Sequence, residues 1–86
     1  MMERPIVLKA RKLMIGQKIA IFPLNQLYGD MRASYAEICS QESMVELAEP
    51  FQAEFVSFDG RYLMCRCERY GCISIDIMSL KNLETV

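Results

Sequence analysis

Histidine and tryptophan are both absent from this sequence of 86 residues, and the lack of histidine restricts its chemistry most. Histidine is the commonest general base near neutral pH and a frequent metal ligand, so Ser-His and Cys-His nucleophile pairs are excluded. Only four glycines are present and none lies close to another, which excludes a glycine-rich phosphate-binding loop. We therefore expect a protein that is not an enzyme and that uses no cofactor.

Long apolar runs are also missing. The longest near-continuous run covers residues 19–24, whereas a membrane span needs ~18 apolar residues. The N-terminus lacks the continuous apolar core of a signal peptide, because Lys9, Arg11 and Lys12 interrupt its apolar residues. The sequence therefore predicts a cytoplasmic protein without membrane contact, and its hydrophobic fraction of 52% predicts a single globular domain over residues 1–86.

The cysteines follow no familiar metal-binding spacing. Cys65, Cys67 and Cys72 form a C-x-C-x4-C pattern with Cys39 far upstream, whereas zinc sites commonly place two to four residues between paired cysteines. A cytoplasmic location keeps thiols reduced. We therefore expect neither a metal site nor a disulfide, but small buried side chains together with one exposed thiol.

The clearest pattern that is present is an alternation of apolar and polar residues between positions 51 and 78. Two four-residue segments interrupt it, Ser57-Phe58-Asp59-Gly60 and Glu68-Arg69-Tyr70-Gly71, and both end in glycine. A type I turn followed by a left-handed residue requires glycine at that place. The pattern predicts a three-stranded antiparallel meander with strands over residues 51–57, 61–68 and 72–78.

Three-residue loops at 58–60 and 69–71 give the predicted register of this meander. They place Phe55 opposite Leu63 and Leu63 opposite Ile77, and a slip of one residue would mix the two faces. The predicted core face consists of Phe51, Ala53, Phe55, Leu63, Cys65, Cys67, Ile73, Ile75 and Ile77. The predicted outer face consists of Gln52, Glu54, Val56, Tyr62, Met64, Arg66, Glu68, Cys72, Ser74 and Asp76.

The N-terminal region predicts a further hairpin, with strands over residues 6–13 and 17–22 around the turn Met14-Ile15-Gly16. Together with the meander it predicts a β-dominated small single domain, a five-stranded open barrel or roll. The order of elements resembles that of SH3-like and Tudor-like barrels at the level of fold only. Such a resemblance implies no particular function.

The middle of the chain is compatible with two secondary structures. Asp30 is a good N-cap, and the apolar residues after it recur at helical spacing, which predicts one short helix near residues 31–40. Residues 44–49 are compatible with a helical turn capped by Ser43 or with a strand. A larger helical content would make the domain α+β instead.

The net charge of −1 is unevenly distributed. Residues 1–18 carry five cations and one carboxylate, a net +4, and residues 19–86 carry five cations and ten carboxylates, a net −5. The favoured interpretation is that the two regions are neighbours in space and offset each other. The alternatives are a surface for a charged partner or pairing between two copies of the chain.

The outer face of the meander carries the predicted partner-binding residues. Val56, Tyr62, Met64 and Met78 form an aromatic and methionine cluster, and Arg66 lies at its charged rim. Tyrosine, methionine and arginine are enriched in protein interfaces, and methionine adapts to the shape of a partner. The alternative is that the chain's own residues 23–49 cover this face.

These features predict a non-catalytic protein-binding module, such as a small regulator or inhibitor of a larger protein, of the kind that phages and other mobile elements encode. Self-association is a related prediction. The alternative is a small-barrel nucleic-acid-binding protein that would use the basic N-terminal hairpin. Its binding residues would be Lys9, Arg11, Lys12 and Lys18, with Tyr70 as a stacking platform. Nucleic acid is the less favoured partner, because +4 is weak for such a footprint.

Overall fold

The computed structural model describes residues 4–24 and 34–86, which form one short helix, seven strands and a 3-10 turn. The elements in chain order are α1 (Pro5–Arg11), β1 (Lys18–Pro23), β2 (Ser34–Ile38), β3 (Ser43–Leu47), β4 (Phe51–Phe58), β5 (Tyr62–Cys67), β6 (Gly71–Asp76), η2 (Ile77–Ser79) and β7 (Leu80–Thr85).

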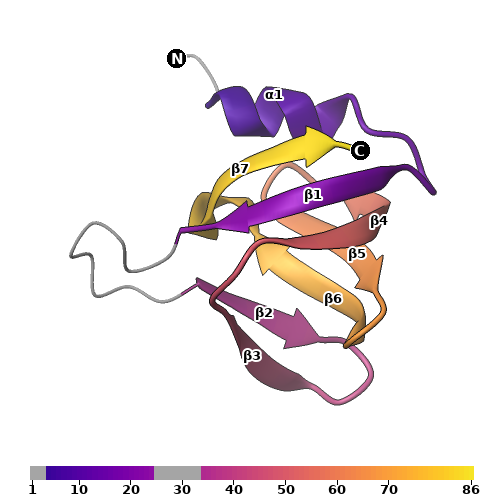
Figure 1. Ribbon diagram of the computed structural model, residues 1–86, viewed down its shortest axis with the longest axis vertical. Coiled ribbons are helices and arrows are strands. Elements are labelled where there is room, and N and C mark those ends of the chain that lie inside the picture. The colour runs from indigo at the N-terminus through magenta and orange to yellow at the C-terminus, as the bar shows by residue number, and fades with distance from the viewer. Residues whose placement is uncertain (1–3, 25–33) are drawn as a thin grey trace.

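All seven strands belong to one antiparallel sheet in the order β3-β2-β6-β5-β4-β1-β7 (Figure 1). Each pairs with its sheet neighbours, and the end strands β3 and β7 are not paired with each other. The prediction of a small β-dominated domain is therefore confirmed, but five strands was too few, and the barrel is not closed.

One buried cluster lies on the inner face of this sheet and draws side chains from α1 and from every strand. Its fully buried large members include Ile19, Ile21, Leu63, Ile73 and Ile75. These residues come from β1, β5 and β6, three strands that are each paired on both sides in the sheet.

The meander is confirmed in its strands and in its faces. Of the predicted core face, every residue is buried except Phe51, which is half-buried, and no residue of the predicted outer face is buried. The register, however, is wrong by two residues: Phe55 lies opposite Cys65, and Leu63 lies opposite Ile75. A shift of two residues exchanges partners but keeps each side chain on its face, which is why the division into faces survived.

Two local features cause this shift. Gly71 adopts the left-handed φ of +72° and is nevertheless paired, opposite Cys67, so the second loop spans residues 68–70 rather than 69–71. In the first hairpin Phe58 lies opposite Leu63, so the loop spans residues 59–62 rather than 58–60, and the ladder then changes register by one between Phe55 and Ser57, where Val56 is the extra residue of a bulge.

The predicted N-terminal hairpin is wrong in its first strand. Residues 5–11 form α1, in which Pro5 occupies the first turn, where its missing N–H is not needed. Ile6, Val7 and Ala10 are buried at helical spacing, and the helix packs along β7. The Met14-Ile15-Gly16 turn is present, with Gly16 at a φ of +89°, but it joins a helix to β1 rather than two strands.

The predicted helix near residues 31–40 is also wrong where the structure describes it. Ser34, Ala36 and Ile38 are buried while Tyr35 and Glu37 are exposed, which is the alternation of a strand. Residues 31–33 of that prediction lie outside the described residues. Residues 43–47 form β3, so the strand alternative applies to the second ambiguous segment.

A single buried hydroxyl joins three elements that are distant in the sequence. Ser34 at the start of β2 is 2% exposed, and its Oγ lies 2.7 Å from both the Leu24 carbonyl oxygen and the Ser79 carbonyl oxygen. The Leu24 N–H also donates to the Ser79 oxygen, at 3.0 Å. This cluster, which we call the Ser34 clasp, ties the end of β1 and the η2 turn to β2.

Parts of the two charged regions are neighbours, because Lys18 lies opposite Glu54 and Glu84 lines one hollow with Lys9 and Lys12, but other parts lie far apart. α1 with its cations is at one end of the long axis and the β2–β3 hairpin with its glutamates is at the other (Figure 1). The molecule extends 36 Å along that axis. The two regions are thus neighbours at β1 and β7 but not at the β2–β3 hairpin, and the interpretation that their charges offset each other stays a prediction.

Candidate protein-binding groove

The outer face of β5 and β6 is not covered by the described part of residues 23–49. β2 and β3 instead join the sheet edge to edge, through the pairing of β2 with β6. This hairpin therefore extends the predicted binding face rather than hiding it.

A groove of about 590 Å³ lies where the hairpin meets the meander. Its lining comes from four strands and the η2 turn, and consists of Tyr35, Glu37, Met44, Tyr62, Ser74, Asp76 and Ser79. We call this set the outer groove. The sheet register explains the grouping, because Glu37 lies opposite both Met44 and Ser74, while Tyr62 lies opposite Asp76.

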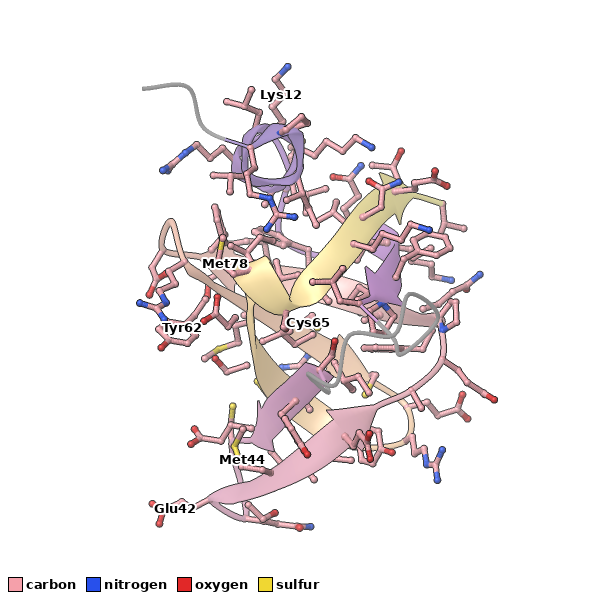
Figure 2. All side chains as sticks on the ribbon, turned by 90° about the vertical axis from the view of Figure 1, so that its left-hand side faces the viewer. Lys12, Glu42, Met44, Tyr62, Cys65 and Met78 are labelled. Carbon is pink, nitrogen blue, oxygen red and sulfur yellow. The ribbon has the colours of Figure 1, made fainter. Side chains whose placement is uncertain are left out.

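Three large side chains form the apolar part of the outer groove. Tyr35 is 49% exposed, Met44 62% and Tyr62 46%. Met44, Tyr62 and the neighbouring Met78 point toward the same side of the molecule in Figure 2. Exposed aromatic and methionine side chains gathered in one place are typical of protein-binding sites.

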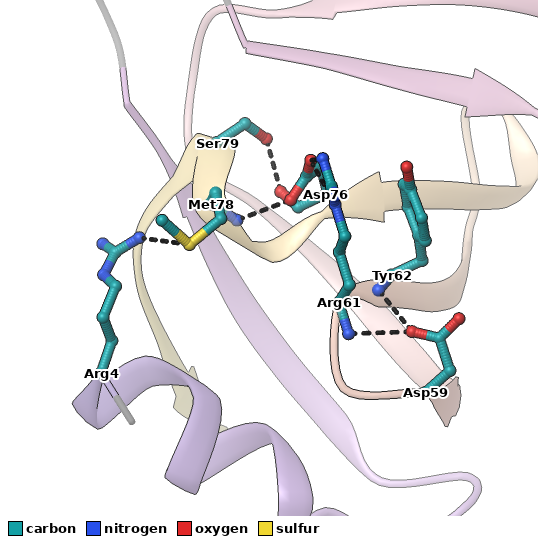
Figure 3. Close-up of polar contacts among 7 residues, drawn as sticks. All are labelled: Arg4, Asp59, Arg61, Tyr62, Asp76, Met78 and Ser79. Carbon is teal, nitrogen blue, oxygen red and sulfur yellow. Dashed lines mark hydrogen bonds and ion pairs between the residues drawn. The ribbon is translucent and has the colours of Figure 1, made fainter. Parts of the chain in front are cut away.

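Polar contacts fix the Tyr62 side of the groove (Figure 3). Arg61 pairs with Asp76 at 3.1 Å, and its guanidinium carbon lies 5.5 Å from the centre of the Tyr62 ring. The other oxygen of Asp76 accepts the Met78 N–H at 3.0 Å. The hydrogen bond and charge of Asp76 raise the pKa of Arg61. One carboxylate thus links the β4–β5 turn, β6 and η2 at the rim.

The turn before β5 presents Tyr62 to the groove. One oxygen of Asp59 accepts the backbone N–H groups of Tyr62, at 2.7 Å, and of Arg61, at 2.8 Å (Figure 3). These two hydrogen bonds, that of Tyr62 first, lower the pKa of Asp59. The turn is therefore held by a charged acceptor, which suits the close return of the chain after Gly60.

The hairpin side of the outer groove is acidic. Glu37, Glu42 and Glu46 are exposed, and no cation pairs with them within residues 4–24 and 34–86. Asp76 is already paired with Arg61. The groove therefore offers negative charge beside tyrosine and methionine surface.

The predicted partner-binding residues are only partly brought together. Tyr62 lines the outer groove, and Met64 lies beside it, opposite Ser74 and half-buried. Met78 is 54% exposed but sits on η2, where the Arg4 guanidinium donates to its sulfur at 3.4 Å. Val56 is half-buried in the bulge.

Arg66 lies one row further along the sheet, opposite Cys72 and Glu54. It is exposed but does not line the groove. The sequence interpretation missed Tyr35, Glu37 and Met44, because it assigned Tyr35 to a helix. The alternation of residues 34–38 was the signal that could have located them.

Of the predicted nucleic-acid residues, Lys9 and Lys12 line one hollow, and Tyr70 lines a different one. The Lys9 ammonium donates to Asn82 at 2.9 Å, and the Arg11 guanidinium stacks on Phe58 at 5.7 Å. Lys12 lies beside Lys9 in a separate hollow, and Lys18 begins β1. Tyr70 packs against the core from the β5–β6 turn, far from α1 (Figure 1). Aromatic stacking and the basic helix are thus separated.

The four cysteines, all within the described residues, are free thiols. Cys65 and Cys67 are buried as predicted, while Cys39 and Cys72 are half-buried. Over residues 4–24 and 34–86, no three cysteine, aspartate or glutamate side chains are placed to hold a metal ion. The helix α1 is too short to cross a membrane, and the described chain contains no longer apolar helix.

Comparisons with protein families, with curated proteins and with solved structures gave no match to this chain.

Proposed function

We propose that this protein is a non-catalytic binding module that holds a segment of another protein in the outer groove. The observation that carries the proposal is the gathering of Tyr35, Met44 and Tyr62, each roughly half exposed, around one groove. Monomeric proteins seldom leave such surfaces without a partner. A regulator or inhibitor of a larger protein needs only a surface of this kind.

The charge of the groove specifies the chemistry of the partner. Glu37 lies between Met44 and Ser74 in the groove, and Glu46 lies opposite Tyr35. A segment with lysine or arginine next to an apolar side chain would match this arrangement, since cations also bind favourably over tyrosine rings. The Arg61 guanidinium, stacked on Tyr62 and paired with Asp76, is an intramolecular example of the same contact.

The nucleic-acid alternative has weaker support. Lys9 and Arg11 are engaged by Asn82 and Phe58, and Tyr70 lies elsewhere. Fold-level likeness to SH3-like or Tudor-like barrels stays a prediction, because the sheet is open and no solved structure matches it.

The proposal is tested by selecting binders from a library of random peptides displayed on phage. We expect the selected peptides to combine lysine or arginine with apolar residues. Truncation of an interface tyrosine costs ~1.5 kcal/mol or more, so Tyr62→Ser should weaken binding about tenfold. Glu37→Lys should weaken it as well, by removing the charge that faces the partner.

Two matched variants serve as controls. Ile15→Ser removes an apolar side chain that is 82% exposed on a different loop, and Glu84→Lys reverses a charge on β7. Both should bind the selected peptides as the unchanged protein does. Peptides that bind equally well to all four variants would contradict the proposal. Binding of a random DNA oligonucleotide that weakens steeply with salt would favour the nucleic-acid alternative.

A further inference from the structure

Two half-buried cysteines face each other across neighbouring strands at the edge of the outer face. The β2–β6 ladder pairs Glu37 with Ser74 and Ile38 with Ile73, so the next positions, Cys39 and Cys72, are directly opposite. The Cys39 N–H donates to the Cys72 carbonyl oxygen at 3.1 Å, which confirms this placement.

This placement meets the geometric requirement of a disulfide. Residues directly opposite each other across an antiparallel ladder have Cα atoms ~4.5–5.5 Å apart, and disulfides join Cα atoms ~4.4–6.8 Å apart. Cys39 follows the buried Ile38 and Cys72 precedes the buried Ile73, so both side chains lie on the outer face of the sheet.

The other two thiols are not equivalent to this pair. Cys65 is completely buried and Cys67 is 8% exposed, both on the inner face of β5. Burial raises the pKa of Cys65 to about 12, which leaves almost none of it as the reactive thiolate at neutral pH. Only Cys39 and Cys72 combine proximity with access to solvent.

We propose that Cys39 and Cys72 form a reversible redox site, in which an intramolecular disulfide fastens β2 to β6. The oxidant is a small-molecule disulfide of the glutathione class. One protein thiolate attacks a sulfur of that disulfide and releases one reduced thiol, and the second protein thiolate then displaces the other. The protein loses two electrons and two protons, and the small disulfide becomes two thiols.

A Cys39–Cys72 disulfide would affect the outer groove by fixing the distance between β2 and β6. Glu37 precedes Cys39 by two residues on β2, and Ser74 follows Cys72 by two residues on β6, so both line the groove on the same face as the thiols. A covalent link would hold these strands at one separation. That consequence rests on the proposed function, whereas formation of the disulfide does not.

The reaction should depend on pH. Partial burial raises the pKa of Cys39, and the neighbouring Cys72 and Glu37 raise it further. Because the thiolate is the attacking species, the rate of disulfide formation should increase as the pH rises from 7 to 9. The site would thus form its disulfide slowly under neutral, reducing conditions.

The experiment equilibrates the purified protein in mixtures of oxidised and reduced glutathione, blocks the free thiols with N-ethylmaleimide and digests the protein with trypsin. Cleavage after Arg32, Arg61, Arg66 and Arg69 puts each of the four cysteines in its own peptide, so mass spectrometry identifies the linked pair directly. We expect a disulfide-linked pair of peptides that joins Cys39 to Cys72. This linked pair should disappear when an excess of reduced glutathione is added.

Cys39→Ser is the matched control, because it changes one half-buried atom and should leave the fold intact by circular dichroism. This variant should form no internal disulfide. The oxidised protein should also melt higher than the reduced protein by roughly 10 °C, since the link closes a long loop. A link through Cys65 or Cys67, or no internal link at any glutathione ratio, would overturn the proposal. Neither disulfide formation nor the change in melting temperature depends on a partner. The peptide selection tests the proposed function separately.

Discussion

Replacing the buried hydroxyl of the Ser34 clasp tests how the two ends of the open sheet are held together. In Ser34→Ala, the Ser79 oxygen keeps the Leu24 N–H at 3.0 Å, but the Leu24 oxygen loses its 2.7 Å partner. A buried carbonyl left without a donor costs ~1–3 kcal/mol. Because one of the two oxygens stays bonded, we expect a loss of about 1–2 kcal/mol in the free energy of unfolding.

Urea unfolding, followed by circular dichroism, measures this loss. For a small domain the free energy falls by ~1–3 kcal/mol per molar urea, so the midpoint should decrease by roughly 0.5–1 M. Ser40→Ala is the control, since Ser40 is exposed and has no clasp contact, and it should change the free energy by less than about 0.5 kcal/mol. Equal midpoints for Ser34→Ala and Ser40→Ala would refute the reasoning.

Three further variants test the core, the β4–β5 turn and the β5–β6 turn. Leu63→Ala empties a site that is 0% exposed on the central strand β5, and should cost about 2–5 kcal/mol in urea unfolding; a smaller loss than 1 kcal/mol would mean that the core collapses around it. Asp59→Asn keeps an acceptor without the charge, and because the folded pKa of Asp59 is lowered, the stability it contributes is present above its ordinary pKa of 3.8 and is lost as the pH falls below it. Its melting temperature should therefore be lower than that of the unchanged protein at pH 6, and the difference should shrink toward pH 3; a constant difference would contradict this. Gly71→Ala meets no atom within 4 Å, so only its left-handed φ of +72° opposes it, and calorimetry should give a loss of about 1–2 kcal/mol; a neutral result would mean that the turn changes conformation.

The meander could be predicted because its information is local. A glycine marked each interruption between strands, and the alternation of apolar and polar residues from Phe51 to Ile77 assigned every side chain to a face. The register was not predictable to the residue. Whether Gly71 is the last residue of the loop or the first paired residue of β6 depends on backbone geometry that alternation does not encode.

The N-terminal and middle elements were wrong for a different reason. Ile6, Val7 and Ala10 fit a helix only because β7, from the other end of the chain, offers a surface for them. Tyr35 and Ile38 fit helical spacing as well as strand alternation, and pairing with β6 decided for the strand. Long-range packing overrides local preference in short segments of this kind.

Only the part of the outer groove that belongs to the meander could be predicted from the sequence. Tyr62 was found because the meander was found, but its neighbours Tyr35 and Met44 belong to a hairpin whose place in the sheet no local pattern shows. The acidic side of the groove was likewise predictable only in part. The glutamates were evident in the sequence, but the sheet order determines that those of the β2–β3 hairpin lie next to tyrosine rather than next to lysine.

That sheet order also governs how the chain can assemble. β1 is hydrogen-bonded on one side to β4 and on the other to β7, so both of its partners lie much later in the sequence. The hairpins β2–β3 and β4–β5–β6 can form on their own, but β1 must wait for the last strand before its second edge is paired. A protein with this connectivity must bring together strands that are far apart in the sequence before its core is complete. We therefore expect refolding on the millisecond-to-second timescale. Truncation of β7 would leave β1 with one unpaired edge and α1 without the strand on which it packs.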